Sequence, residues 1–479
     1  MTRILTVAGL IDAGGARGPS AIIVEGDRIT AVRDLAPGEA HDDVLVLPAL
    51  ANAHDHARSL RTSSIGGFGR PLETWLHRLQ LFGSVDPWLA SVAPFGRALL
   101  GGQGASMVHY TRVQGLTDFV TEAKEVARAA SDVGLRIAFG IAMRDANPLV
   151  YGESGPILDA LSPAARAEVE ARFLAKPLPV AEQLARVEAV AAAIASPMVD
   201  VQYGPNGVQW STPALLEGIA EASERTGRRV HMHLLETRYQ RDWADRHFPG
   251  GIARHLKEIG LLSPRLTLAH CTWASPQDLE LIAESGATIS VNTSSNLALR
   301  SGLAPVAAMI KAGCKVGLGI DGQAFDEDDD LLREMRLVWS LHAGWGFDRQ
   351  VSTADVMQAV FTAGHRTLNS PVTGRIEAGA PADLVVLDRA ALDDDALMDV
   401  PPVELLFARA SGRHLKETLI AGRVVVRDGT VTGVDLPAIH RELRAAMRGQ
   451  VEARGAFRAA LPELEAVICR HFSDSLGCC

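Results

Sequence analysis

The chain has 479 residues, of which 47% are hydrophobic and 22% charged, and its formal net charge at pH 7 is −10. This balance is typical of a globular protein and excludes a disordered or fibrous chain. The acidic charge also argues against a nucleic-acid-binding protein, because such proteins neutralise phosphates with concentrated basic surfaces.

The sequence lacks the features of an exported or membrane protein. No apolar stretch approaches the ~18–20 residues that a membrane-spanning helix needs. Residues 1–7 run into Gly and Asp instead of the apolar region of a secretory signal. Five cysteines without CxxC spacing are too few for a disulfide framework. We therefore expect a cytoplasmic protein that has neither a membrane nor a nucleic acid as its partner.

The first fifty residues predict short strands separated by turns that contain glycine. The candidates are residues 4–7, 21–24, 29–32 and 44–47. A similar strand-rich region returns late in the chain, at residues 382–387, 417–420 and 423–427. We expect both chain ends to form one small β-sandwich-like domain, made of residues 1–48 and 376–436.

Between these regions, short apolar runs alternate with long amphipathic stretches, which is typical of repeated β-α units with a parallel sheet. The eight candidate strands are residues 49–53, 105–109, 136–141, 199–203, 229–234, 266–270, 288–292 and 315–320. We therefore predict an α/β fold, a (β/α)8 TIM barrel over residues 49–375. Residues 437–479 predict a helical C-terminal tail, because Ile439, Leu443 and Met447 recur at helical spacing.

The first predicted barrel strand ends in the motif NAHDH, residues 52–56. Alternate residues of a strand point the same way, so His54 and His56 present two imidazoles to one side. At the C-terminal end of a barrel strand, that side is the mouth where active sites lie. Taken alone, the pair fits metal ligation and a chance spacing with one buried histidine equally well.

Further residues of the metal-binding types end three other strands. The fifth strand ends in HMHLLE, residues 231–236, where one histidine can bind a metal while Glu236 handles protons. The alternation leaves open whether His231 or His233 is the ligand. His270 closes the sixth strand and Asp321 the eighth. Taken alone, each of these two residues is more typical of a capping or hydrogen-bonded polar group than of a functional residue. The ends of the strands of one barrel share a rim, however, so the metal-binding residue types at all four strand ends together predict one site.

With these motifs the sequence resembles the amidohydrolase superfamily, in its branch of cytosine, guanine and S-adenosylhomocysteine deaminases and triazine hydrolases. The motifs are AHDH, HLLE, AHC, VNTSSNLALRSG and GIDG at strands one, five, six, seven and eight, followed by GRIEAGAPADLVVLD. The resemblance implies four metal ligands, a proton shuttle, and a residue that orients the attacking water or the substrate. These are His54, His56, His233 and Asp321, then Glu236, then His270.

The implied chemistry suits these residue types. Neutral imidazoles and a carboxylate fit a divalent transition metal, zinc first and iron as the alternative. Such a cation lowers the pKa of its bound water from ~15.7 towards ~7, and Asp321 and Glu236 can move protons. Binuclear members typically carry a carboxylated lysine at the end of the fourth strand. Residues 199–204 contain no lysine, so we expect one metal ion.

Candidate substrate contacts lie on the loops. Trp75, near Glu73, stands where the family has a lid-like segment, although a tryptophan also fits the core. Asn206 replaces the histidine that often follows proline after the fourth strand, and it fits loop capping as well. Arg58 and Arg300 can meet an anionic substrate, although most arginines are solvated.

The expected function is metal-dependent hydrolytic deamination of an aminated N-heterocycle of purine, pterin, pyrimidine or triazine type, with release of ammonia. One alternative is displacement of chloride or an alkylamine from a triazine-like ring, and another is hydrolysis of a cyclic amide. A non-catalytic barrel would be expected to have lost ligands, and all of them are present. The expected partner is a small heterocyclic substrate, and the formation of a homo-oligomer stays open.

Overall fold

Eight parallel strands form the central barrel of the computed structural model, which describes residues 2–322 and 327–475. They are β6 (Leu50–Asn52), β7 (Gln103–Tyr110), β8 (Arg136–Met143), β9 (Val199–Pro205), β10 (Val230–Leu234), β11 (Leu266–His270), β12 (Thr288–Val291) and β13 (Lys315–Leu318). Each pairs in parallel with the next. A backbone hydrogen bond from Ala53 N to Leu318 O (2.7 Å) joins the last strand to the end of the first. The predicted (β/α)8 barrel is confirmed.

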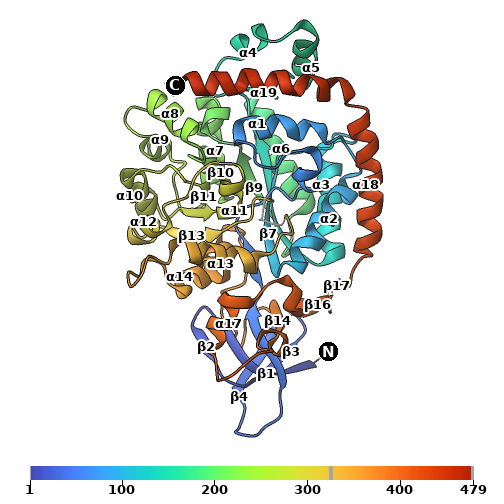
Figure 1. Cartoon of the computed structure of the whole chain (residues 1–479), viewed down its shortest axis with the longest axis vertical. Helices are drawn as coiled ribbons and strands as arrows, with labels where there is room; N and C mark the ends of the chain where they lie inside the picture. The colour runs from blue at the N-terminus through green and yellow to red at the C-terminus, as the bar shows by residue number, and fades with distance from the viewer. Residues whose placement is uncertain (1, 323–326, 476–479) are drawn as a thin grey trace.

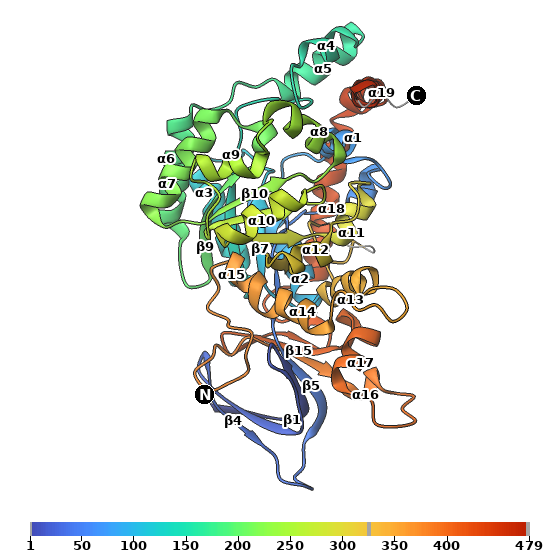
Figure 2. The same cartoon turned by 90° about the vertical axis from the view of Figure 1, so that its left-hand side faces the viewer.

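Helices surround this barrel (Figures 1 and 2). They include α2 (Pro87–Leu100), α3 (Phe119–Val133), α6 (Val180–Ile194), α7 (Pro213–Thr226), α8 (Arg238–His247), α9 (Ile252–Glu258), α10 (Pro276–Ser285), α11 (Thr293–Ala298), α12 (Val306–Lys311), α13 (Leu331–His342), α14 (Thr353–Gln358) and α15 (Gly364–Thr367). Local signals set their ends, as α3 illustrates. The Asp118 side chain accepts from the amides of Val120 and Thr121 at its start, and Gly134 (φ 83°) ends it in the left-handed conformation.

Short helical segments interrupt several loops. They are the 3-10 helices η1 (Thr62–Ile65), η2 (Leu79–Leu81), η3 (Val208–Trp210) and η5 (Gly412–His414), the π-helix η4 (Ala359–Ala363), and α1 (Leu72–Arg78), α4 (Gly155–Asp159), α5 (Pro163–Phe173), α16 (Arg389–Leu392) and α17 (Pro402–Arg409). Of these, α1 and η2 border the cavity described below.

Both ends of the chain build a second sheet, drawn below the barrel in Figure 1. Its strands are β1 (Thr2–Asp12), β2 (Gly15–Arg17), β3 (Ser20–Glu25), β4 (Arg28–Asp34), β5 (Asp42–Pro48), β14 (Leu384–Asp388), β15 (Leu415–Ile420), β16 (Arg423–Arg427) and β17 (Thr430–Val431). The antiparallel pairing of β5 with β14 joins the two halves. The predicted β unit from both ends is confirmed, while the division into residues 1–48 with 376–436, 49–375 and 437–479 stays a prediction.

Two helices follow this sheet and return along the barrel, α18 (Leu436–Glu452) and α19 (Gly455–Ser475). The periodic residues Ile439, Leu443 and Met447 are buried on α18, which packs against α2. α19 lies at the end of the molecule away from the second sheet and packs against α5 and α1 (Figures 1 and 2). Phe457 and Leu464 anchor it in a hydrophobic cluster with Val169 of α5.

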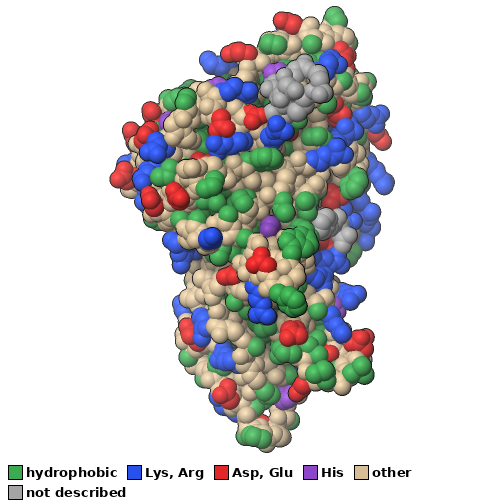
Figure 3. Space-filling model, turned by 60° about the vertical axis from the view of Figure 1, so that its left-hand side comes forward, with side chains coloured by type: hydrophobic (Ala, Val, Ile, Leu, Met, Phe, Trp, Pro, Cys, Tyr) green, Lys and Arg blue, Asp and Glu red, His purple; other side chains and the backbone are tan. Residues whose placement is uncertain are grey.

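The surface carries charges of both signs. Figure 3 shows lysine and arginine side chains interspersed with aspartate and glutamate over one face. In the described part of the chain, no helix combines the length and the apolar character needed to span a membrane.

Candidate active site and metal centre

Polar side chains from four separate strand ends converge at the barrel mouth. His54 Nε2 and His56 Nε2 each lie 3.2 Å from Asp321 Oδ1, and His233 Nε2 lies 3.2 Å from His56 Nε2. His270, from the neighbouring strand, stacks on His233 with ring centroids 5.5 Å apart. The four residues predicted as metal ligands therefore lie together, although they are up to 267 positions apart in the sequence (321 − 54).

Backbone carbonyls orient two of these imidazoles. His56 Nδ1 lies 2.9 Å from His109 O, and His233 Nδ1 lies 2.6 Å from Asn206 O. A carbonyl oxygen only accepts hydrogen bonds, so each Nδ1 carries the proton and each Nε2 keeps a free lone pair. Those lone pairs are directed at the point where the two rings meet Asp321, which is the tautomer that a metal ligand requires.

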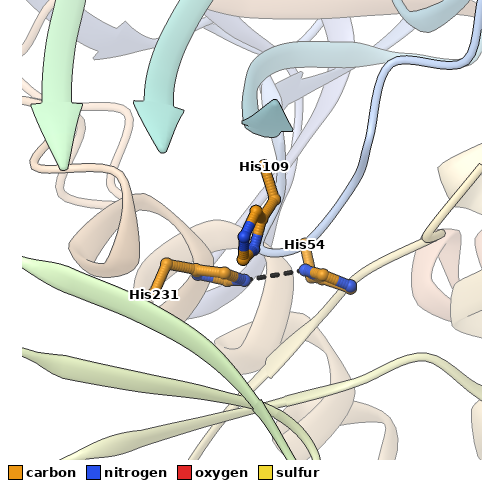
Figure 4. Close-up of side chains that lie close together, drawn as sticks. All are labelled: His54, His109 and His231. Atoms are coloured by element: carbon orange, nitrogen blue, oxygen red, sulfur yellow. Dashed lines mark hydrogen bonds between the residues drawn. The ribbon is translucent and has the colours of Figure 1, made fainter. Parts of the chain in front are cut away.

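His231 lies in a different position from His233, behind the metal-ligand candidates. Its Nε2 is 2.7 Å from His54 Nδ1, and the two rings are nearly parallel (Figure 4). His109 approaches the same pair edge-on from the end of β7, and its own Nε2 donates to Gly204 O (3.0 Å). His231 therefore contacts the far side of a candidate ligand ring, while His233 contacts the candidate site itself.

The residues present fit a divalent metal ion. The buried atoms His54 Nε2 and His270 Nε2 make no accepted hydrogen bond within the described residues, and their polar neighbours are carboxylate oxygens of Asp321 (3.2 Å) and Glu236 (3.7 Å). A buried polar atom without a hydrogen bond is costly. Nitrogen and oxygen atoms of His54, His56 and Asp321 lie within 4.8 Å of one another. Imidazole nitrogens with one carboxylate oxygen form the donor set that zinc takes in hydrolytic sites.

The backbone around the site is strained. Asp321 (φ 58°), His270 (φ 79°) and Leu235 (φ 51°) all adopt the left-handed conformation that side chains other than glycine rarely adopt. Close approach also matters before Asp321, since a Cβ atom at Gly319 would lie 2.8 Å from both the amide nitrogen and the carbonyl oxygen of His54. The GIDG motif thus brings the eighth strand directly against the first.

Burial and charge separate the protonation states of the two central carboxyl groups. Burial raises the pKa of Glu236 well above its usual value, and the neighbouring Asp321 and Glu73 add to the rise. Burial also opposes ionisation of Asp321, but His54 and His56 hold its pKa well below the usual range. These pKa shifts favour the protonated form of Glu236 and the ionised form of Asp321. Burial keeps the imidazole of His56 neutral by lowering its pKa to about 4.

Helix α11 and the loop after it, which follow β12, hold three of these groups by hydrogen bonds. Ser295 Oγ donates to Asp321 Oδ2 (2.6 Å), and Ser301 Oγ donates to Glu236 Oε1 (3.1 Å). Asn296 Oδ1 lies 2.8 Å from His270 Nδ1. The motif VNTSSNLALRSG was noted in the sequence without assigned roles. Its signal was an unusual density of hydroxyl and amide side chains directly after a barrel strand.

One cavity of about 200 Å³ opens onto the site. His56, His233, Glu236 and Asp321 lie in its wall, together with the substrate candidates Trp75 and Asn206. Trp75 is buried and also packs with Leu72 and Leu299, so its core and cavity-lining interpretations both hold.

The third substrate candidate, Arg300, lies elsewhere. It is exposed, it does not line this cavity, and the chain turns there in the left-handed conformation (φ 58°) as it leaves α11. Glu73, by contrast, lines the cavity and accepts hydrogen bonds from Thr237 Oγ1 (2.6 Å) and Tyr151 OH (2.9 Å). The roles of Tyr151 and Thr237 could not be predicted from the sequence, because they depend on contacts between distant loops.

Comparison with known proteins identifies the family to which the chain belongs. The model of the amidohydrolase family matches residues 45–425, and the chain belongs to this family. Within it, the chain is 30% identical over 448 residues to 5-methylthioadenosine/S-adenosylhomocysteine deaminase of Nitratidesulfovibrio vulgaris Hildenborough, covering 91% of this chain and 94% of that protein. It is 26% identical to 5'-deoxyadenosine deaminase of Methanothermobacter thermautotrophicus, covering 89% and 93%.

Solved structures share the fold. An adenosine deaminase from Xanthomonas campestris with bound zinc matches with a TM-score of 0.76 and 22% identity, over 93% of this chain and 98% of that one. A mutant of atrazine chlorohydrolase TrzN from Arthrobacter aurescens TC1, complexed with zinc and atraton, matches with a TM-score of 0.75 and 21% identity, over 93% and 99%.

Proposed function

We propose that this protein is a metal-dependent aminohydrolase that removes the exocyclic amino group of an aminated N-heterocycle and releases ammonia. The observation that carries the proposal is the buried carboxyl of Glu236, whose pKa is raised by burial and which lines the same cavity as His56, His233 and Asp321. An acid beside a hydrolytic metal site is what removal of an amino group from a ring requires. The relatives that act on adenosine derivatives favour a purine nucleoside among the candidate heterocycles.

In this proposal the three histidines and Asp321 would hold one divalent ion, zinc with iron as the alternative, which would lower the pKa of water and so supply the nucleophile. Glu236 donates its proton to a ring nitrogen, which makes the adjacent carbon electrophilic. Addition of the water oxygen to that carbon releases the two protons of the water, of which one passes through Asp321 to the amino group and the other restores the acid form of Glu236. The amino group then leaves as ammonia, and a ring carbonyl remains.

The chain supplies the positioning for these transfers. Ser301 holds Glu236 Oε1, so that Oε2 lies 3.7 Å from His270 Nε2. Burial lowers the pKa of His270 to about 3, so this imidazole is neutral and orients the water or the substrate without carrying charge. Ser295 fixes the Asp321 carboxylate through Oδ2 and leaves Oδ1 facing His54 and His56.

A paired release assay tests the proposal. The purified protein is loaded with zinc or iron, its metal content is measured, and ammonia release is screened over adenosine derivatives, guanine, cytosine, pterins and amino-triazines. Chloride release from chlorotriazines is followed in parallel. We expect about one metal ion per chain and ammonia from a purine derivative. Chloride release without ammonia release would instead establish the triazine alternative, and a fully active metal-free protein would refute the hydrolase assignment. The cytoplasmic location and any homo-oligomer stay predictions.

A further inference from the structure

Three consecutive strand-to-helix loops each contribute one arginine to the cavity. Arg58 follows β6, Arg112 follows β7 and Arg144 follows β8, and these strands are neighbours in the barrel. All three side chains line the cavity that contains Glu236 and Asp321. We call this part of the wall, made by Arg58, Arg112 and Arg144, the arginine sector.

Arg58, which follows His56 by two residues, forms no ion pair with the described carboxylates. Its guanidinium lies over the ring of Trp75, 4.6 Å from the centroid, and its Nε is buried without a hydrogen-bond partner. The adjacent Asp55 is occupied by hydrogen bonds from Asn52 Nδ2 (2.8 Å) and Ala57 N (2.7 Å).

The other two arginines have only neutral partners. Arg112 donates to the carbonyl oxygens of Leu79 and Phe82, and its Nε is buried without a partner. Arg144, which is more exposed, donates to Asn147 O (3.1 Å). Neither forms an ion pair with a described carboxylate. Burial, and then the charges of Arg454 and Arg58, lower the pKa of Arg112 to about 10, so the positive charges of this wall reinforce one another.

The cavity's own carboxyl groups have other partners. Glu73 accepts hydrogen bonds from Thr237 and Tyr151, and Glu236 accepts one from Ser301. Asp321 lies against His54 and His56 at the candidate metal centre, and none of these described carboxylates forms an ion pair with the arginine sector. Guanidinium groups that have no carboxylate partner are available to a ligand, and they bind carboxylates and phosphates through paired hydrogen bonds.

We propose that the arginine sector binds an anionic substituent, a carboxylate or a phosphate, carried by the substrate. The inference rests on the proposed function, because it places the reacting heterocycle at Glu236 and the anionic group at Arg58 and Arg112. Apolar residues between the two regions suit the linking part of such a molecule. They are Leu76, Leu79 and Phe82. The substrate class thus narrows to aminated heterocycles with an acidic arm.

Binding to an inactive holoenzyme tests this inference separately from turnover. In the zinc-loaded Glu236→Gln variant, calorimetry compares adenosine with adenosine 5'-carboxylate and adenosine 5'-monophosphate, and pterin with pterin-6-carboxylate. We expect at least one anionic compound to bind about tenfold or more tightly than its neutral counterpart, since hydrogen bonds to charged groups are among the stronger ones. Comparison of the carboxylate with the phosphate identifies the preferred group.

Matched arginine variants locate the effect. Adding Arg58→Gln should bring the affinity ratio of anionic to neutral compound close to one, and Arg58→Lys should keep part of it, because lysine retains the charge without the planar fork. Arg238→Gln removes an exposed charge at the start of α8, outside the cavity, and should leave the ratio unchanged. Thermal melting verifies that each variant is folded.

Several results would overturn the inference. Equal affinity for neutral and anionic compounds would do so. A loss of the affinity ratio in Arg238→Gln as large as that in Arg58→Gln would also do so. The absence of measurable binding by every anionic compound would be a third such result. Ammonia release from neutral heterocycles with no such preference would leave the proposed function intact and reject the arginine sector. Arg58-dependent anion binding without any ammonia release would instead support the arginine sector and reject the proposed function.

Discussion

At the scale of single residues, the site is organised by what each imidazole does with its second nitrogen. His56 and His233 donate from Nδ1 to backbone carbonyls, whereas His54 shares its Nδ1 hydrogen bond with the imidazole of His231. If His54 binds a metal through Nε2, its Nδ1 carries the proton and His231 Nε2 accepts it. His231 is then a positioning residue, which orients a ligand without touching the ion.

This arrangement predicts that His231 tunes metal affinity. His231→Leu removes the acceptor for His54 and should weaken zinc binding by about 10- to 100-fold, as is typical for partners of metal-bound histidines. His231→Gln retains an oxygen acceptor and should lose less. Competition with a chelator measures the affinity, and thermal melting of the metal-free proteins controls for damage to the barrel. Equal zinc affinity in all three proteins would contradict the assignment.

Glu236 yields a second residue-scale prediction. Glu236→Gln removes the transferable proton and should lower kcat by about 100- to 10,000-fold while the metal content stays near one per chain. Glu73→Gln is a matched control, because Glu73 is another buried carboxyl in the same cavity whose raised pKa already favours the neutral form. Its kcat should change far less. Similar losses of kcat in both variants would argue against a specific proton shuttle.

Sequence reasoning identified the ligand types but could not derive their partners. Residues two apart on a strand share a face, so periodicity alone could not separate His231 from His233, and both do approach His54. The acceptors for His56 and His233 are backbone carbonyls of His109 and Asn206, which any side chain at those positions would supply. Such partners are set by the path of the backbone.

At the scale of elements, the barrel strands were predictable because apolar runs of four to eight residues between amphipathic stretches leave few alternatives. The exact ends of these strands were less predictable. The predicted eighth strand ran to residue 320, whereas β13 ends at Leu318, because Gly319 must pass against the backbone of His54. Arg300 was expected in this loop, but its exposed position outside the cavity follows a left-handed turn that the sequence does not mark.

One histidine couples an element to the barrel in a pH-dependent way. His365 of α15 is buried, with Nε2 donating to Ala49 O (2.8 Å), and burial lowers its pKa from 6.5 to about 4. The unfolded chain binds this proton at a higher pH than the folded one. The contribution of neutral His365 to the free energy of unfolding is therefore fully present above pH ~6.5. It is lost as the pH falls towards ~4, and the loss is up to about 3 kcal/mol.

Urea unfolding at pH 7 and pH 5 measures this loss. His365→Gln removes the titrating group, so the difference in free energy of unfolding between the two pH values should shrink. Exposed His41 provides the control, and His41→Gln should leave the difference unchanged. An unchanged pH dependence in His365→Gln would contradict the prediction.

At the scale of the whole molecule, the C-terminal helices complete a cavity whose chemistry comes from the barrel. Met447 of α18 and Phe472 of α19 line it, and the Phe472 ring lies 5.2 Å from that of Tyr151, which holds Glu73. The sequence predicted the helical tail from its periodicity. Its place in the cavity wall could not be predicted, because it depends on the packing of α19 against α5 and α1.

Two phenylalanines on α19 test separately the contribution of this helix to the cavity wall and the contribution of its packing to stability. Phe472→Ala removes part of the cavity wall and should raise KM by about tenfold with little change in metal content. Phe457→Ala, at a fully buried position outside the cavity, should lower the free energy of unfolding by about 3–5 kcal/mol. Its KM should change little. Steady-state kinetics and denaturant unfolding of both variants check the contrast, and a similar rise in KM for both would contradict it.

The pairing of β5 with β14 constrains how the protein is made. Pro48 and Leu384 are partners in register, separated by 336 positions (384 − 48). At a translation rate of about 5–20 residues per second, the ribosome needs tens of seconds to deliver the second strand after the first. During that interval one edge of β5 has no native neighbour, and an unpaired edge invites association with other chains. The nascent polypeptide therefore depends on shielding of this edge until the last fifth of the chain, which begins near β14, emerges.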